Sequence, residues 1–213
     1  MKKLYVPFLN HLNAIDAIGT ISSSLDKLQK ESMEYAPWIT DFPYKPLVEF
    51  SMGHSGDCIF LKYYNVEKFI RAAEGNNNGQ VWKDSCVEFF VSFDENGYYN
   101  FEFNCIGTTL IGFRKTRENR EHLPVEAIKK IRYQALIKNS DHQSIEWHLT
   151  LAIPLEVFIR HDLKTLHHKD CRANFYKCGD GLPQPHYLCW SDINSPKPDF
   201  HLPHFFGSLH FES

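Results

Sequence analysis

The sequence predicts an all-β protein, an antiparallel β-sandwich with one or two short peripheral helices. Several short segments alternate between apolar and polar residues, and turn-forming residues separate them. Aromatic residues make up 15% of the chain, which favours strands because flat rings pack well on a pleated surface. The 213 residues fit one domain, residues 1–213, and contain neither an internal repeat nor a linker.

The clearest predicted element is a β-hairpin over residues 86–106. Residues 87–93 alternate in polarity, as expected for a strand with one buried face. The sequence Asp-Glu-Asn-Gly at 94–97 is a strong turn signal, and residues 98–106 form the second strand. This hairpin is expected at the centre of a sheet.

The remaining elements follow from the same periodicity. Further strands are predicted over residues 58–64, 147–153, 172–178, 186–190 and 209–211. A helix is predicted over residues 22–35, and the charged stretch 114–130 is either a second helix or a long loop. Trp147 begins an alternating strand and is expected in the core, whereas Trp38 is expected to anchor the core or its edge.

A polar face of the hairpin is the first candidate for a site. Because side chains alternate across a strand, Asn100, Glu102 and Asn104 share one face. If residues 82–90 form one extended stretch, Trp82 and Glu88 also share a parity. Carboxylates and amides bond sugar hydroxyls, and an aromatic ring covers the C–H face of a sugar. The alternative interpretation is a solvated face of an antiparallel sheet.

Composition excludes several classes of partner. The net charge is 23 − 26 = −3 with no basic cluster, which argues against nucleic acid. No stretch approaches the ~20 apolar residues of a membrane span. The N-terminus lacks a clear signal peptide, which favours a cytoplasmic location, and the six cysteines are expected to be free thiols. The oligomeric state is not predicted.

Two parts of the sequence resemble a known family. The stretches Trp-Lys-Asp-Ser-Cys-Val-Glu-Phe-Phe at 82–90 and Tyr-Tyr-Asn-Phe-Glu-Phe-Asn at 98–104 are similar to the central hairpin of family 9 carbohydrate-binding modules. Residues 172–177, 198–201 and 206–207 resemble the C-terminal part of the same family. The resemblance implies a DOMON-like β-sandwich that binds a mono- or oligosaccharide without catalysis, often between two tryptophans.

The resemblance also implies a set of ligand-binding residues. Trp82 matches the first sandwich tryptophan and Glu88 the acidic hydroxyl ligand, while Trp190 is the candidate for the second tryptophan. The remaining candidates bond hydroxyls: Asn104, Arg114 and Asn174. No catalytic or metal-binding residue and no cofactor is predicted. Structural calcium occurs in relatives, but the sequence shows no loop of spaced Asp ligands.

Two other functions stay open at this point. Glu88 and Glu102 could serve a glycoside-processing enzyme, which needs two carboxyl groups held about 5–9.5 Å apart. A haem-binding DOMON-like domain would need axial ligands, for which Met52 and His54 are the candidates, although they are too close to lie on opposite faces of a haem. His201 and His204 are expected in structural or surface roles, because nearby prolines prevent a helix that would aim both at one metal.

Overall fold

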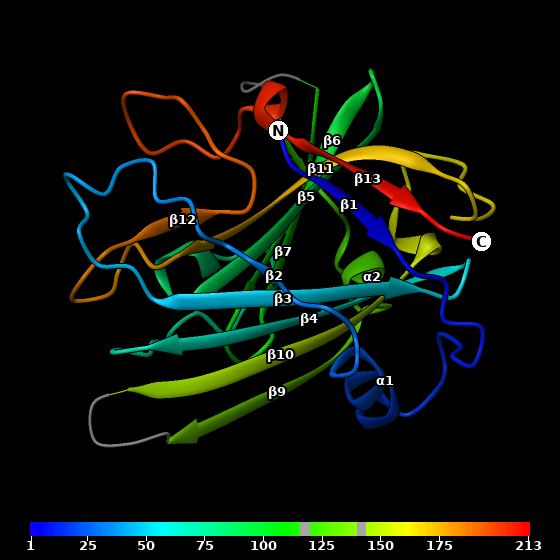
Figure 1. Cartoon of the computed structure of the whole chain (residues 1–213), viewed down its shortest axis with the longest axis horizontal. Coiled ribbons are helices and arrows are strands. Elements are labelled where there is room, and N and C mark those ends of the chain that lie inside the picture. The colour runs from blue at the N-terminus through cyan, green and yellow to red at the C-terminus, as the bar shows by residue number, and fades with distance from the viewer. Residues whose placement is uncertain (116–119, 140–143) are drawn as a thin grey trace.

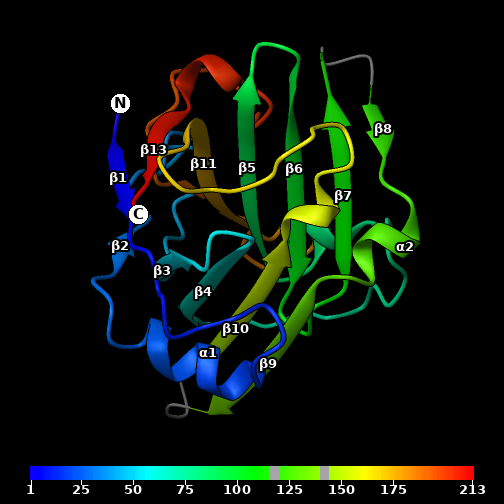
Figure 2. The same ribbon diagram turned by 90° about the vertical axis from the view of Figure 1, so that its right-hand side faces the viewer.

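Two β-sheets packed face to face form the body of the protein (Figure 1). The computed structural model describes residues 1–115, 120–139 and 144–213. The large sheet has the order β1-β13-β11-β5-β6-β7-β8, with β12 paired to β11, and the small sheet has the order β2-β3-β4-β10-β9. Figure 2 shows the strands of the large sheet side by side. All neighbouring strands are antiparallel except β1 and β13.

The bounds of the strands are as follows. The large sheet contains β1 (Lys3–Val6), β5 (Cys86–Asp94), β6 (Gly97–Asn104), β7 (Thr109–Arg114), β8 (Arg120–His122), β11 (Asp170–Cys178), β12 (Tyr187–Cys189) and β13 (Gly207–Phe211). The small sheet contains β2 (Glu31–Ser32), β3 (Leu47–His54), β4 (Cys58–Glu67), β9 (Arg132–Asn139) and β10 (Ile145–Pro154).

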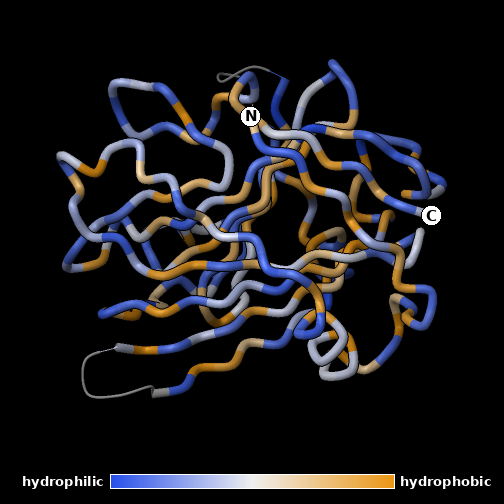
Figure 3. Tube along the Cα trace, in the orientation of Figure 1, coloured by the Kyte–Doolittle hydropathy of each residue, from blue (hydrophilic) through white to orange (hydrophobic). Residues whose placement is uncertain are grey.

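The main core lies between the two sheets. It is built from the inward-facing residues of both, including stacked Phe50 and Phe175, whose ring centroids are 3.9 Å apart. Trp147 on β10 is fully buried there, which confirms its predicted core position. Hydrophobic and hydrophilic residues alternate in short stretches along the trace (Figure 3), as expected when each strand buries one face. Within the described ranges, no helix has the length and apolar character needed to cross a membrane.

A second apolar layer covers the outer face of the large sheet. The connection between β2 and β3 and the one between β12 and β13 lie together at the left of Figure 1. They are joined through Trp38, whose ring packs edge-on against Tyr187 and whose indole N–H donates to the carbonyl of Ser195 at 2.8 Å. This placement confirms that Trp38 is an anchor. The outer layer positions the candidate site.

A short helix of eight residues covers the opposite side of the molecule. Helix α1 (Ile18–Leu25) packs Ile21 and Leu25 on the outer face of the small sheet, against Phe60. Lys62 fastens it, because its ammonium donates to the Asp26 carboxylate at 2.7 Å. The helix predicted over residues 22–35 is therefore wrong at both ends. It begins earlier, and the chain after it turns back into β2.

Most of the other predicted elements are present. The hairpin is confirmed as β5 and β6, and the remaining predicted strands correspond to β4, β10, β11, β12 and β13. The stretch 114–130 contains β8 and the short helix α2 (Val125–Ile128) rather than one long element, and its residues 116–119 lie outside the described part. Six strands were not predicted: β1, β2, β3, β7, β8 and β9. Short 3-10 turns complete the order: η1 (Val81–Lys83), η2 (Leu155–Val157) and η3 (Pro203–Phe205).

Candidate functional site

A pocket of about 280 Å³ opens on the outer face of the large sheet, between the sheet and its covering layer. Carboxylates form its floor, and aromatic side chains form much of its wall. The pocket is lined by Trp82, Glu88, Glu102, Cys178, Asp180, Tyr187, Pro198, Asp199, Phe200 and His201. Its size is near the lower end of the usual range for small-molecule sites.

The floor holds two acidic side chains on neighbouring strands. Glu88 of β5 and Glu102 of β6 are directly opposite each other in the antiparallel register. They are only 3% and 4% exposed. Asn100 Nδ2 donates to Glu102 Oε1 at 2.9 Å, and the Cys178 thiol donates to Glu88 Oε1 at 3.1 Å. These two hydrogen bonds hold both carboxylates in place.

Glycine on β7 makes room for the amide that holds Glu102. Gly112 lies opposite Asn100 in the β6–β7 register. A Cβ atom at Gly112 would lie 2.5 Å from Asn100 Oδ1, closer than real contacts allow. The missing side chain therefore lets the Asn100 amide lie across β7.

One wall of the pocket comes from the η1 turn and the end of β11. Trp82 is in the middle of η1, and its backbone carbonyl accepts a hydrogen bond from the amide of Asp180 at 3.2 Å. Burial raises the pKa of the Asp180 carboxyl, although a hydrogen bond from Tyr187 opposes the shift. Burial also raises the pKa of the Tyr187 phenol, and the neighbouring Asp180 charge adds to this. An indole, a phenol and a carboxyl group thus stand together on this side.

The opposite wall is the segment 198–201, which is anchored through its aromatic rings. Phe200 stacks on Tyr176 of β11 with centroids 4.2 Å apart and planes 9° apart. His201 stacks on Phe90 at 5.0 Å, and its Nδ1 lies 3.2 Å from the Tyr98 hydroxyl. Because these contacts hold the segment against the sheet, the pocket is formed before any ligand arrives.

Of the six predicted ligand-binding residues, Trp82 and Glu88 line the pocket. The shared parity of Trp82 and Glu88 does not hold, since residues 82–90 are not one extended stretch, and the assignment of Trp82 rests on the family resemblance alone. Trp82 belongs to η1, and the strand begins only at Cys86. The turn, rather than strand parity, brings the indole to the same pocket as Glu88.

Trp190 lies on the other side of the sheet. It is fully buried in the main core, where its ring packs edge-on against Phe50 and Phe175. Its indole N–H donates to Glu31 Oε2 at 2.9 Å. A ring enclosed in this way cannot stack on a ligand, so the assignment of Trp190 as the second sandwich tryptophan is corrected.

Asn104 shares the outer face but works as a structural group. Its Nδ2 donates to the Glu74 carbonyl at 2.9 Å and to Asp84 Oδ2 at 3.0 Å. Its Oδ1 accepts from the backbone amides of Ile106 and Thr108. These four bonds use the capacity of the amide, and Asn104 does not line the pocket.

Asn174 is likewise occupied by the protein. It is fully buried on β11, donates to the Ser191 carbonyl at 2.9 Å and accepts from the Ser191 amide at 2.8 Å. The pair ties β11 to the chain that follows β12. Asn174 therefore connects two segments of the protein through hydrogen bonds, and it does not line the pocket.

Arg114 ends β7 directly across from Tyr98 on β6. It is 7% exposed and does not line the pocket. Tyr98, its partner across the ladder, contacts the pocket residue His201, so Arg114 is near the edge of the site without lining it. The structure thus brings Trp82 and Glu88 together in the pocket and places Asn104, Asn174 and Trp190 outside it.

The structure also shows site residues that were not predicted as ligands. Glu102 was recognised as part of the polar hairpin face and as a possible catalytic carboxylate, but it was not among the predicted ligands. Asp180 and Tyr187 follow β11 and begin β12, where no sequence signal points to the hairpin. His201 was assigned a structural or surface role, yet it lines the pocket. The segment 198–201 was noted for its resemblance, and that was the signal available for it.

The polar hairpin face is not solvated, because the outer layer covers it. Tyr98, Asn100, Glu102 and Asn104 are all at most 4% exposed. The haem alternative fits less well. Met52 and His54 are buried two residues apart on β3, so both side chains project from the same face of one strand.

Comparisons with known proteins agree with this architecture. The sequence profile of carbohydrate-binding family 9 matches residues 20–211. A presumed carbohydrate-binding protein from Bacteroides uniformis is 36% identical over 99% of both chains, and its crystal structure superposes with a TM-score of 0.92. No curated protein sequence is significantly similar to this chain.

Two more distant structures share the fold. Both are of a family 9 carbohydrate-binding module from Caldicellulosiruptor kristjanssonii, one in complex with glucose and one with cellotriose. Both are 9% identical to this chain and align with 99% of it. The alignment covers 96% of the glucose-bound module with a TM-score of 0.63, and 94% of the cellotriose-bound module with a TM-score of 0.62. At this identity they establish the β-sandwich fold. The profile match over residues 20–211 shows that the chain belongs to carbohydrate-binding family 9.

Proposed function

We propose that the pocket between the hairpin and segment 198–201 binds a sugar unit and does not turn it over. The observation that carries this proposal is the combination of two buried carboxylates on the floor with aromatic rings on the wall of one preformed pocket. Membership in carbohydrate-binding family 9 supports the same ligand class.

The floor suits the hydroxyl edge of a sugar. Glu88 and Glu102 offer carboxylate oxygens, which accept hydrogen bonds from hydroxyl groups more strongly than neutral acceptors do. Both are held by other side chains, so little side-chain entropy remains to be lost on binding. This arrangement orients a ligand through its hydroxyl pattern.

The wall suits the C–H face of the same sugar. Trp82 is partly exposed and lines the pocket, as do Tyr187 and His201. An indole provides a large rigid apolar surface with few rotatable bonds. Trp190 is buried in the core, so the pocket has one tryptophan, and its other aromatic surfaces come from Tyr187, Phe200 and His201.

The position of the two carboxylates favours binding over hydrolysis. Glu88 and Glu102 project from adjacent strands of one sheet, at opposed positions of the ladder. They therefore approach a ligand from the same side. A glycosidase places an acid and a nucleophile or base so that they flank the scissile bond. Two acceptors on one floor instead bond neighbouring hydroxyls.

A panel of immobilised glycans followed by calorimetric titration tests this proposal. Glucose and cellotriose, the ligands of the Caldicellulosiruptor complexes, are the first probes in solution. We expect saturable binding that Trp82→Ala weakens roughly thirtyfold. The control is Tyr5→Ala, which deletes a 54% exposed ring on β1, outside the pocket. Binding that both variants retain, with both folded, would place the site elsewhere.

Catalysis needs a separate measurement. Incubation of the protein with aryl glycosides and with any glycan from the panel should release no product. Turnover that disappears in Glu88→Gln while the fold is retained would contradict the proposal and identify Glu88 as a catalytic acid or nucleophile.

A further inference from the structure

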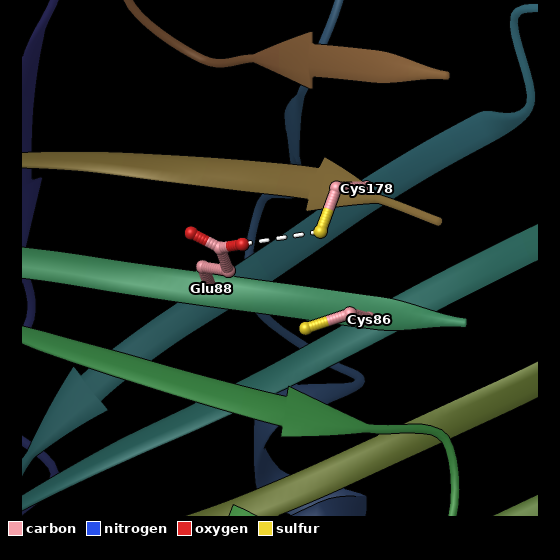
Figure 4. Close-up of side chains that lie close together, drawn as sticks. All are labelled: Cys86, Glu88 and Cys178. Atoms are coloured by element: carbon pink, nitrogen blue, oxygen red, sulfur yellow. Dashed lines mark hydrogen bonds between the residues drawn. The ribbon is translucent and has the colours of Figure 1, made fainter. Parts of the chain in front are cut away.

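Two cysteines and a glutamate lie close together at the pocket, which Glu88 and Cys178 line. Cys86 and Glu88 lie on the same face of β5, and Cys178 lies opposite Cys86 on β11. Their Sγ and carboxylate oxygen atoms all lie within 4.8 Å of one another. Figure 4 shows the three side chains close together, with the Cys178 thiol bonded to Glu88 and Cys86 beside them on β5. Among the described residues, this is the group of three whose donor atoms have metal-ligand spacing.

We propose that Cys86, Glu88 and Cys178 form a binding site for a thiophilic divalent cation, of which Zn²⁺ is the type. The proposal concerns the metal alone and does not depend on sugar binding.

The distances are close to those that a metal requires. In a tetrahedral zinc site, metal–sulfur bonds of about 2.3 Å and metal–oxygen bonds of about 2.0–2.2 Å place the donor atoms roughly 3.5–3.8 Å apart. Cys178 Sγ and Glu88 Oε1 are already 3.1 Å apart. The third donor needs to move by little more than about 1 Å, which side-chain rotation provides.

The donor set selects the type of metal. Thiolates prefer zinc and other soft or borderline ions, whereas calcium takes only oxygen ligands. Two sulfurs and one carboxylate therefore do not fit calcium. Three protein ligands leave a fourth position, as in zinc sites that accept an outside molecule. Because Glu88 and Cys178 line the pocket, that position is reachable from it.

The charge balance is also favourable. Binding exchanges two thiol protons for one divalent ion and leaves the net charge of the cluster unchanged. The carboxylates of Glu88 and Glu102 lie opposite each other on neighbouring strands beside the two thiols and favour a cation there.

Cobalt(II) is the probe for the test, because thiolate–cobalt bonds produce a charge-transfer band and tetrahedral cobalt a strong visible spectrum. Reduced, metal-free protein is titrated with Co²⁺ without any sugar and then with Zn²⁺. We expect both spectral features to saturate at one cobalt per chain and to disappear when zinc displaces the cobalt. If the reduced parent protein shows no charge-transfer band when cobalt is added, the proposal is overturned.

Variants locate the ligands. Cobalt affinity should fall by more than about tenfold in each of three variants, Cys86→Ala, Cys178→Ala and Glu88→Gln. Loss of a residue that only hydrogen-bonds to a metal ligand already costs about tenfold, so loss of a ligand itself should cost more. The matched control is Cys189→Ala, which removes a buried thiol of the same outer layer but not of the cluster. Circular dichroism confirms that each variant is folded. Equal cobalt binding in parent, Cys86→Ala and Cys178→Ala would overturn the site, as would its loss only in Cys189→Ala.

A disulfide bond between Cys86 and Cys178 would exclude the proposal. Peptide mapping of protein purified without reductant reports whether Cys86 and Cys178 are joined. Free thiols or a zinc-protected pair support the metal site, whereas a disulfide between these two residues would overturn it in favour of a redox pair.

Discussion

Two glutamates buried near the same end of β11 have opposite surroundings. Glu67 lies on the core side, 1% exposed, with the Lys177 ammonium at 3.1 Å and the Trp147 indole N–H at 2.6 Å. Glu88 lies on the outer side, 3% exposed, and borders a cavity of about 280 Å³. Consecutive residues of β11, Lys177 and Cys178, supply their partners.

The comparison separates burial for stability from burial for binding. Around Glu67 the protein provides a cation and an indole donor and encloses them completely. Around Glu88 it provides a thiol, a second carboxylate across the ladder, and space for a ligand. Similar exposure therefore has different consequences, and the neighbours decide which of them applies. Mutations of the two clusters should have distinct effects.

The largest effect is expected from breaking the closed cluster. Lys177→Met leaves Glu67 as an uncompensated buried charge, which costs about 3–5 kcal/mol of unfolding free energy. Glu88→Gln keeps the shape of a side chain at a pocket and should cost less than about 1.5 kcal/mol. Chemical denaturation of both variants measures the difference. Equal destabilisation would remove the distinction between the clusters.

The two tryptophans on opposite sides of the sheet provide a similar pair. Trp190→Ala removes a fully buried ring from the main core and should cost about 3–5 kcal/mol of unfolding free energy. Trp82→Ala should have a smaller effect on stability but reduce sugar affinity by about 2 kcal/mol, roughly thirtyfold. Denaturation and calorimetry on the same samples check both. A folded Trp190→Ala variant that alone loses binding would reverse the assignment.

The closed cluster also predicts a pH dependence of stability. His186 faces Lys177 and Glu67, and its ring packs edge-on against Tyr44. Burial, followed by the Lys177 charge, lowers the pKa of His186 to about 3. In the unfolded chain His186 takes up a proton near pH 6.5, whereas in the folded protein it does so only near pH 3. The contribution of His186 to the unfolding free energy is therefore fully present above about pH 6.5 and decreases as the pH falls toward about 3.

The measurement is unfolding free energy against pH. His186→Gln should remove up to about 1.4 kcal/mol per pH unit of slope below about pH 6.5. His11→Gln, at an exposed position, is the control and should leave the slope unchanged. A parent slope that His186→Gln does not alter would show that this histidine is protonated in the folded protein.

The smallest effect is expected from a change outside the lining of the pocket. Gly112→Ala would place a Cβ atom against Asn100 and displace the amide that donates to Glu102. Losing one such bond should cost about 0.5–1.5 kcal/mol of sugar affinity, up to roughly tenfold. Calorimetry on the folded variant reports it. An unchanged affinity would mean that Asn100 does not position Glu102 for the ligand.

Much of the sheet could be predicted from the sequence because alternation is a local signal. The hairpin of β5 and β6 has strong alternation and a strong turn, and it is confirmed. Strand β3 was missed because its end is buried on both faces, by the main core and by the layer under α1, and it therefore shows little alternation. Helix α1 was misplaced because its serines give no clear boundary.

The site was predictable only where it lies on the hairpin. Glu88 follows from strand parity and Trp82 from the family pattern, since both are close in sequence. Parity places Asn104 on the right face but does not show that backbone groups occupy its amide. The assignment of Trp190 as a ligand-stacking residue fails because neighbouring residues of an extended chain face opposite sides of the sheet: Cys189 lies in the outer layer and Trp190 in the main core. Tyr187 and His201 reach the pocket through the outer layer, whose path depends on long-range packing.

The central claim is that the acidic floor of the pocket binds the ligand. Calorimetric titration of the parent and Glu88→Gln with the strongest glycan of the panel tests it most directly, with thermal unfolding recorded on the same samples. The predicted result is a loss of about 1.5–3 kcal/mol of affinity, which is at least tenfold, in a variant that unfolds near the parent temperature. Unchanged affinity in folded Glu88→Gln would contradict the claim.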